Sequence, residues 1–161
     1  AAIGALLMVA LPTAVAGTAW VGNFGDANTT LIPGDDMRAM EDLRAQSDAR
    51  DVVWQYPENP FLAYPSGRDA WAAIVAGRTV INSQRATDYA AAEPMIALSE
   101  RFFAGDNVPV PAQVDWVYLS RALHPASYNA LLARMQKDTG WLQASCYADA
   151  CLFSRVRSAR P

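Results

Sequence analysis

Residues 114–120, VDWVYLS, and residues 141–156, WLQASCYADACLFSRV, decide the fold of this chain. The first run is rich in β-branched and aromatic residues and predicts a strand. The second holds two such runs around the turn YADA and predicts a hairpin. Between them, apolar residues at helical spacing run from Pro125 to Lys137, and Gly140 follows as a stop. The last third therefore predicts strand, helix and hairpin.

Helices and strands also alternate in the preceding part of the chain. Residues 36–46 predict a helix with Asp35 as its cap, and residues 51–56, DVVWQY, predict a strand. Residues 67–76 predict a second helix, which Gly77 would end.

Two further elements complete the alternation. Residues 78–82, RTVIN, predict a short strand, and residues 94–104 predict a helix that begins at Pro94. Alternating elements of this kind are typical of an α/β fold. We therefore expect a small three-layer α/β domain around a mixed sheet.

The amino-terminal segment differs from the rest of the chain. Of the 161 residues, 52% are hydrophobic and 18% are charged, yet residues 1–21 contain no charge. As a helix these residues would extend roughly 30 Å, which is about the thickness of a bilayer core. We predict a transmembrane helix; a secretory signal peptide and a buried core helix are the alternatives.

This prediction divides the chain into four parts. Residues 1–21 are expected to be the last transmembrane helix of a longer protein, and residues 22–34 a linker. Residues 35–157 would form the extracytoplasmic α/β domain, and residues 158–161 a tail. Residues 22–37 contain three aspartates and no Lys or Arg, whereas cytoplasmic flanks are usually basic. The protein is therefore expected at the cell membrane, with its soluble part outside.

Charge and motifs limit the possible functions. A net charge of −3 argues against a nucleic-acid partner. The chain has no phosphate loop, no GxGxxG and no GxSxG motif. Its one histidine, His124, is interpreted as a structural residue at a helix start, and a single histidine makes a poor zinc site. Asp115 is expected to face solvent at a sheet edge, so no catalytic or metal-binding residue is assigned.

Two cysteines, Cys146 and Cys151, flank YADA. A turn centred on residues 148–149 would place them opposite each other in the hairpin. Directly opposed strand residues have Cα atoms about 4.5–5.5 Å apart, which is within disulfide range. On an oxidising side of the membrane we expect a disulfide; two reduced buried thiols are the alternative.

An aromatic and amide set supplies candidate ligand contacts. The loop after strand 51–56, YPENPFLAYPSGRDAW, leaves the carboxyl end of that strand, where binding loops of α/β sheets cluster. Rings that stack on sugar faces, with amide and guanidinium donors, suit a sugar or a lipid phosphate. Alternatively, Trp54 and Trp71 belong to the core. The candidate substrate-binding residues are Trp54, Tyr56, Asn59, Tyr64, Arg68, Trp71, Asn82, Gln84 and Arg85.

The helix GDDMRAMEDLRAQ, the strand and loop VVWQYPENPFLAYPSGR, and the closing run from VDWVYLSRAL to LFSR resemble a known pattern. Together they resemble the C-terminal, extracytoplasmic part of bacterial multi-pass glycosyltransferases of the C type, which transfer a sugar from a polyprenyl-phosphate carrier. Related multi-pass membrane proteins share the pattern. The resemblance covers most of residues 35–155.

The resemblance implies a role for the whole protein more than for this chain. In such enzymes the catalytic carboxylate lies near the first membrane spans, so no residue here inherits that role. The soluble part would cap the membrane cavity and contact the acceptor or the lipid-linked donor. Its partners would be the transmembrane part of the same protein, the membrane, and a lipid-linked sugar or glycan. No cofactor is expected for this part, and the residues of this part do not determine whether the parent protein uses one. The alternatives are a membrane-anchored or secreted module that binds a glycan or partner, and a purely structural tail.

Overall fold

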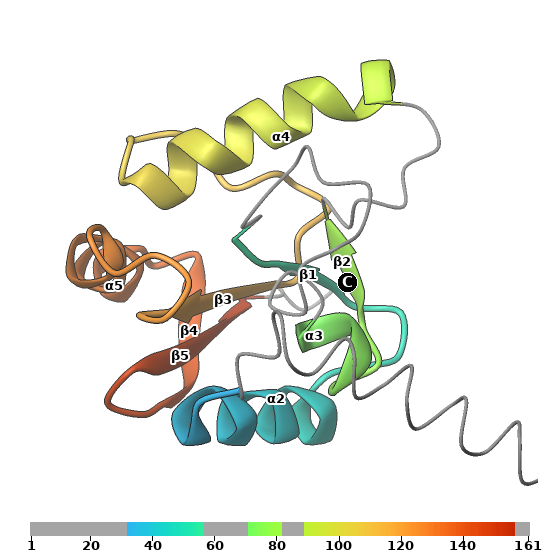
Figure 1. Ribbon diagram of the computed structural model, residues 1–161, viewed down its shortest axis with the longest axis vertical. Helices are drawn as coiled ribbons and strands as arrows, with labels where there is room; N and C mark the ends of the chain where they lie inside the picture. The colour runs from blue at the N-terminus through green and yellow to red at the C-terminus, as the bar shows by residue number, and fades with distance from the viewer. Residues whose placement is uncertain (1–31, 57–70, 82–88, 157–161) are drawn as a thin grey trace, which may run out of the picture. The chain divides into compact units, whose positions relative to one another are not determined.

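The structure is a computed structural model that describes residues 32–56, 71–81 and 89–156 (Figure 1). The chain divides into two units, Ala1–Leu31 and Ile32–Pro161, and all described residues lie in the second. The elements of that unit are α2 (Gly34–Gln46), β1 (Val52–Trp54), α3 (Trp71–Ile74), β2 (Thr79–Ile81), α4 (Tyr89–Ala104), β3 (Trp116–Ser120), α5 (Tyr128–Lys137), β4 (Trp141–Cys146) and β5 (Ala150–Arg155).

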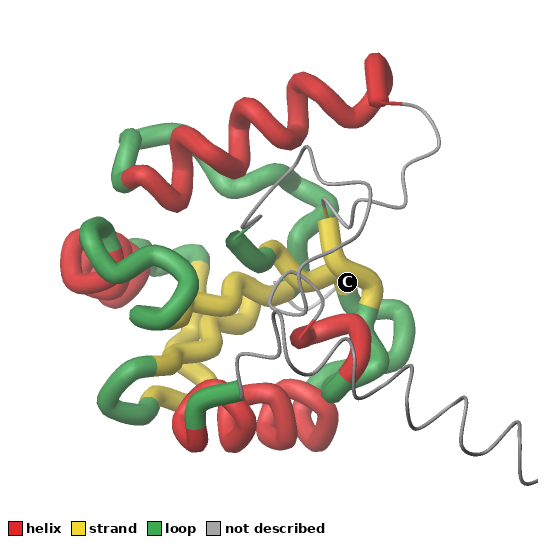
Figure 2. Tube along the Cα trace, viewed as in Figure 1, coloured by secondary structure: helices red, strands yellow, loops and turns green. Residues whose placement is uncertain are grey.

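The strands form one mixed sheet in the order β2-β1-β3-β5-β4. Strand β1 runs parallel to both β2 and β3, while β5 runs antiparallel to β3 and β4. Helices cover both faces: α2 and α3 lie on one side of the sheet, and α4 and α5 lie on the other (Figures 1 and 2). The domain is therefore an α/β fold of three layers around a mixed sheet, as the alternation of elements predicts.

Strand β3 is the centre of the sheet and is buried along its whole length. Its side chains alternate between two hydrophobic clusters, with Trp116 and Tyr118 in one and Val117 and Leu119 in the other. Strand side chains point to opposite faces in turn, so a strand covered on both faces must be apolar at nearly every position. The run WVYLS satisfies this requirement.

The hairpin β4–β5 is formed in the predicted register. Cys146 lies directly opposite Cys151. Helix α5 also forms, although it begins at Tyr128 and not at Pro125. The reason is local: the backbone N–H groups of Ser127 and Tyr128 both donate to the carbonyl of His124, which makes residues 125–127 a turn that leads into the helix.

The other helices differ at their amino-terminal ends. Helix α4 begins at Tyr89, five residues before the predicted start, and Pro94 lies inside it. Pro94 is the sixth residue of α4, and it removes only the one intrahelical hydrogen bond that its own N–H would donate. Residues 67–70 of the predicted 67–76 helix lie outside the described ranges. Gly77, the predicted stop after α3, has a φ of 68°, a conformation that favours glycine.

Two predictions about aspartates are wrong. Asp35 does not cap α2: Pro33 occupies the cap position, and Asp35 pairs with Arg38 and accepts the backbone N–H of Asp149 at 3.1 Å. Asp115 does not face solvent at an edge, because it precedes the central strand β3. Its carboxylate accepts the backbone N–H of Val52 at 3.0 Å and so extends the β1–β3 pairing.

The transmembrane prediction concerns residues 1–21, which lie outside the described residues. Within the described ranges, no helix has the length and apolar character needed to cross a bilayer. The assignment of residues 1–21 stays a prediction.

Candidate ligand-binding cleft

Strands β1 and β3 have the arrangement at which ligand-binding crevices form in α/β sheets. These two strands are parallel neighbours, and their carboxyl ends lie at the same edge of the sheet. The next described helix after β1 is α3, on one face, whereas the chain after β3 continues to α5, on the opposite face. In open α/β sheets, ligands bind outside the carboxyl ends of strands at the point where connections diverge to opposite faces.

A cleft of about 710 Å³ opens at this position. Its walls come from Tyr56 shortly after β1, the turn after β3, the carboxyl end of α4 and the amino end of α5. The volume falls within the range of small-molecule sites. The described lining residues are Tyr56, Glu100, Phe103, Ala104, Gly105, Leu123, His124, Pro125, Ala126, Ser127 and Ala130.

Tyr56 reaches the cleft through the alternation of β1. It follows Trp54 by two residues, so its side chain points to the same face of the sheet. Its half-buried ring meets Phe103 edge-on at a centroid distance of 5.6 Å and lies 5.8 Å from the imidazole of His124. Tyr56 is therefore an aromatic wall of the cleft that stays partly accessible.

His124 is held from both sides by backbone hydrogen bonds. Its N–H donates to the carbonyl of Ser120 at 3.1 Å, and its carbonyl accepts from Ser127 and Tyr128 at 3.3 and 3.0 Å. Its ring packs against Phe103, at 5.3 Å, and Tyr128, at 6.0 Å. The side chain is only 4% exposed. The end of β3 and the start of α5 together therefore set where the imidazole lies.

Among the described residues, neither ring nitrogen of His124 has a hydrogen-bond partner. Burial among apolar and aromatic groups lowers the pKa of His124 to about 3, so the ring is neutral near pH 7. A neutral imidazole has one N–H donor and one acceptor nitrogen. An unsatisfied buried polar group costs about 1–3 kcal/mol, which is a reason for a ligand or water to occupy this place.

The cleft has binding groups but no assembled catalytic pair. Glu100 lies exposed at the rim, and the hydroxyl of Ser127 donates to the carbonyl of Phe103. A catalytic base needs its nucleophile or proton donor within hydrogen-bond reach. Neither nitrogen of His124 has such a partner among the described residues.

A second buried polar group lies on the opposite face of the sheet. The hydroxyl of Tyr118 donates to the carboxylate of Asp36, which is fully buried. Burial raises the pKa of Asp36, and it raises the pKa of Tyr118 well above 10.0. This bond joins the first turn of α2 to the central strand, and neither residue lines the cleft.

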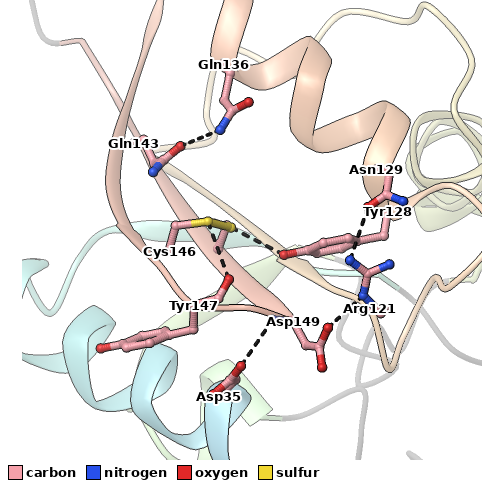
Figure 3. The surroundings of a disulfide bond; sticks show 10 residues. Asp35, Arg121, Tyr128, Asn129, Gln136, Gln143, Cys146, Tyr147 and Asp149 are labelled. Atoms are coloured by element: carbon pink, nitrogen blue, oxygen red, sulfur yellow. Dashed lines mark hydrogen bonds and ion pairs between the residues drawn. A yellow bond between two sulfur atoms is a disulfide. The ribbon is translucent and has the colours of Figure 1, made fainter.

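The hairpin is fastened to α5, the helix whose start lines the cleft (Figure 3). Cys146 and Cys151 form a disulfide with a Cα separation of 4.1 Å, and the hydroxyl of Tyr128 lies 3.3 Å from the sulfur of Cys151. Arg121 covers the ring of Tyr128 at 4.5 Å and pairs with Asp149 at 2.7 Å. These contacts fix α5 and therefore the cleft wall.

The structure separates the three described members of the predicted contact set. Trp54 is fully buried, stacks on Phe102 at 4.4 Å and donates its indole N–H to Ser99 at 2.6 Å. Trp71 is 2% exposed and packs in the other hydrophobic cluster. Both tryptophans therefore belong to the core, which is the alternative that the sequence analysis gave for them. Tyr56 alone of the three lines the cleft. The remaining candidates lie outside the described residues: Asn59, Tyr64, Arg68, Asn82, Gln84 and Arg85.

Sequence reasoning missed His124, Phe103 and Ser127 as cleft residues. The signal for His124 was present, because it follows shortly after the carboxyl end of strand 114–120, the kind of position that favours a binding loop. Phe103 and Ser127 carry no comparable signal. Across the described ranges, no group of three His, Cys, Asp or Glu side chains is placed to hold a metal ion.

Comparison with known proteins adds no relative. No protein-family model matches the chain, and neither a curated protein nor a solved structure matches it significantly.

Proposed function

We propose that this chain is the extracytoplasmic, ligand-binding part of a membrane protein that transfers a sugar from a polyprenyl-phosphate carrier. The cleft beyond β1 and β3 contacts the acceptor or the lipid-linked donor. The chemical step belongs to the membrane part of the same protein. The observation that carries this proposal is a cleft of about 710 Å³ with an aromatic wall at Tyr56 and an unpartnered, neutral His124.

Three further features support the proposal. The uncharged residues 1–21 and their acidic flank fit an anchor with the domain outside the cell. The disulfide of Cys146 and Cys151 fits an oxidising compartment, since such bonds are rare in the cytosol. The sequence pattern of residues 35–155 resembles the soluble tail of C-type glycosyltransferases.

Binding measurements on the full chain in lipid nanodiscs test the proposal. The probes are short-chain prenyl-phosphate hexoses and pentoses and the matching methyl glycosides. We expect saturable binding of at least one probe, and a loss of about tenfold in affinity for Tyr56→Ala, because a stacking ring is removed. Tyr147→Ala is the matched control: Tyr147 bonds Asp42 and does not line the cleft. The proposal fails if no probe binds, or if both variants bind equally well.

A membrane-anchored or secreted module that binds a glycan is the second candidate. It is favoured by the lack of a nucleophile or proton donor beside His124 among the described residues. The gene upstream of Ala1 discriminates the two. Many hydrophobic segments there indicate a multi-pass transferase, and a basic segment after a start codon indicates a secreted or singly anchored binder.

A further inference from the structure

We infer that the cleft receives the uncharged, hydroxyl-bearing part of its ligand and not a phosphate, with the imidazole of His124 as hydrogen-bond partner of a ligand hydroxyl. The inference rests on the proposed function and assigns the cleft to one chemical part of the ligand. It also gives His124, which the sequence presents as structural, a role in specificity.

The charge of the lining disfavours an anion. Among the described lining residues, Glu100 is the one acid and no Lys or Arg occurs. Phosphate sites in proteins are built with cationic side chains or with free backbone N–H groups. A carboxylate at the rim repels a phosphate and tolerates a neutral sugar.

Several backbone N–H groups around His124 are not available to an anion. A phosphate at a helix start binds N–H groups that have no other partner. Here the N–H groups of Leu123 and His124 donate to the carbonyl of Ser120, at 3.3 and 3.1 Å. Those of Ser127 and Tyr128 donate to the carbonyl of His124, at 3.3 and 3.0 Å. These four donors at the start of α5 are already used.

A hydroxyl group fits the imidazole better than an ion does. The neutral ring needs an acceptor for its N–H and a donor for its other nitrogen. A hydroxyl can both donate and accept, so it can pair with whichever ring nitrogen it reaches. An ionised carboxylate only accepts, and an ammonium only donates. The adjacent half-buried ring of Tyr56 can stack on the apolar face of the same sugar.

The single histidine of this chain makes the test direct. The full chain, labelled with ¹⁵N and held in detergent micelles, is titrated with methyl glycosides of mannose, glucose and galactose. Inorganic phosphate is titrated separately at the same ionic strength. Because only one imidazole is present, its ring nitrogen signals are unambiguous. We expect at least one glycoside to shift them saturably, with phosphate shifting them by less than a tenth as much.

Variants then test whether His124 acts through its nitrogens. His124→Phe keeps a ring but removes both polar atoms, and we expect affinity for the binding glycoside to fall about tenfold. His124→Asn keeps a donor and an acceptor, and we expect it to retain part of that affinity. Tyr147→Phe, on the hairpin away from the cleft, should bind as the unchanged chain does. Thermal unfolding of each variant shows whether the fold is kept.

Two failures have different meanings. If phosphate shifts the His124 signals more than every glycoside does, or if His124→Phe binds glycoside with unchanged affinity, the inference is overturned while the cleft remains a binding site. If glycosides, phosphate and prenyl-phosphate sugars all leave the His124 signals unmoved, the proposed function falls as well.

Discussion

At the residue scale, burial acts in opposite directions on two ionisable side chains. Burial disfavours a charge, so it lowers the pKa of His124 to about 3 and raises the pKa of Asp36. The two residues lie on opposite faces of the sheet, His124 beside α5 and Asp36 in α2. His124 is thus neutral in the folded state near pH 7.

The depressed pKa of His124 predicts a loss of stability in mild acid. The unfolded chain binds a proton at this residue below about pH 6.5, whereas the folded chain does so only near pH 3. The free energy of unfolding should therefore fall as pH drops from 6.5, by roughly 3 kcal/mol at pH 4.5. Urea unfolding at pH 7.5, 6.0 and 4.5 measures this change.

His124→Phe provides the control for that prediction. It has no proton to bind, so its free energy of unfolding should fall less over the same interval. Asp36 acts with the opposite sign: its raised pKa favours the folded state in acid and costs stability as pH rises above 3.8. An equal slope in both proteins would show that His124 is not the group responsible.

At the element scale, Arg78 joins the end of α2 to the start of β2. Its guanidinium donates to the carbonyls of Arg44 and Ser47, at 2.8 and 2.9 Å, and to the hydroxyl of Ser47 at 2.6 Å. It also donates to the carbonyl of Ala76 at 2.9 Å. The last carbonyls of a helix lack intrahelical partners, so this one side chain satisfies groups that the helix leaves open.

Replacing Arg78 should destabilise the domain. We expect Arg78→Ala to cost about 2 kcal/mol, because several acceptors near α2 lose a charged donor. Arg78→Lys should recover less than half of the loss, since an ammonium cannot reach acceptors in several directions at once. Urea unfolding measures both variants, with the exposed Arg50→Ala as a control that should change little. Full recovery by lysine would mean that charge and not geometry matters here.

The disulfide of the hairpin is the second stabilising feature at the element scale. Cys146 and Cys151 are five positions apart, and closing so short a loop in the unfolded chain is worth about 2 kcal/mol in the chain-entropy model. We therefore expect a reductant to lower the free energy of unfolding by about that amount. The double variant Cys146→Ala with Cys151→Ala should start from the lower value and show no response to reductant. A similar response in the double variant would assign the effect to something other than the disulfide.

At the scale of the whole molecule, the cleft exists because helices cover both faces of one sheet. The next described helix after β1 lies on one face and the helix after β3 lies on the other, and the cleft lies beyond the carboxyl ends of these two strands. Aromatic rings from the segment just after β1, from α4 and from α5 pack around His124. No single element contains the site.

The anchor prediction also belongs to the whole molecule. If residues 1–21 cross a bilayer, the full chain should float with liposomes in a density gradient and should resist extraction with carbonate. Leu7→Arg combined with Leu11→Arg should weaken this association, since each charge in mid-membrane costs about 3 kcal/mol. Paired changes to alanine at the same positions are the control. Flotation that is unaffected by the arginines would argue against a membrane span.

Local signals account for the parts of the fold that sequence reasoning predicted correctly. The β4–β5 hairpin, its cysteine register and helix α5 depend on residues within a few positions of each other. Periodicity and turn chemistry report such contacts directly. Local patterns did not place Asp35 correctly. An aspartate near a helix start is favourable both at the cap and in the first turn, and Asp35 lies in the first turn.

The sequence by itself determined the fold class, the hairpin and the chemical nature of the candidate residues. Tertiary structure decided which of them meet. The pairing of Val52 with Asp115 spans 63 positions, and no local pattern encodes such a contact. The sequence alone does not distinguish a tryptophan that lines a cleft from one that packs in the core, and Trp54 packs in the core. Among the described residues His124 lacks a hydrogen-bond partner, and the rings that surround it come from three separate parts of the chain. Burial is a property of the assembled chain, so the neutral imidazole appears only when the layers come together.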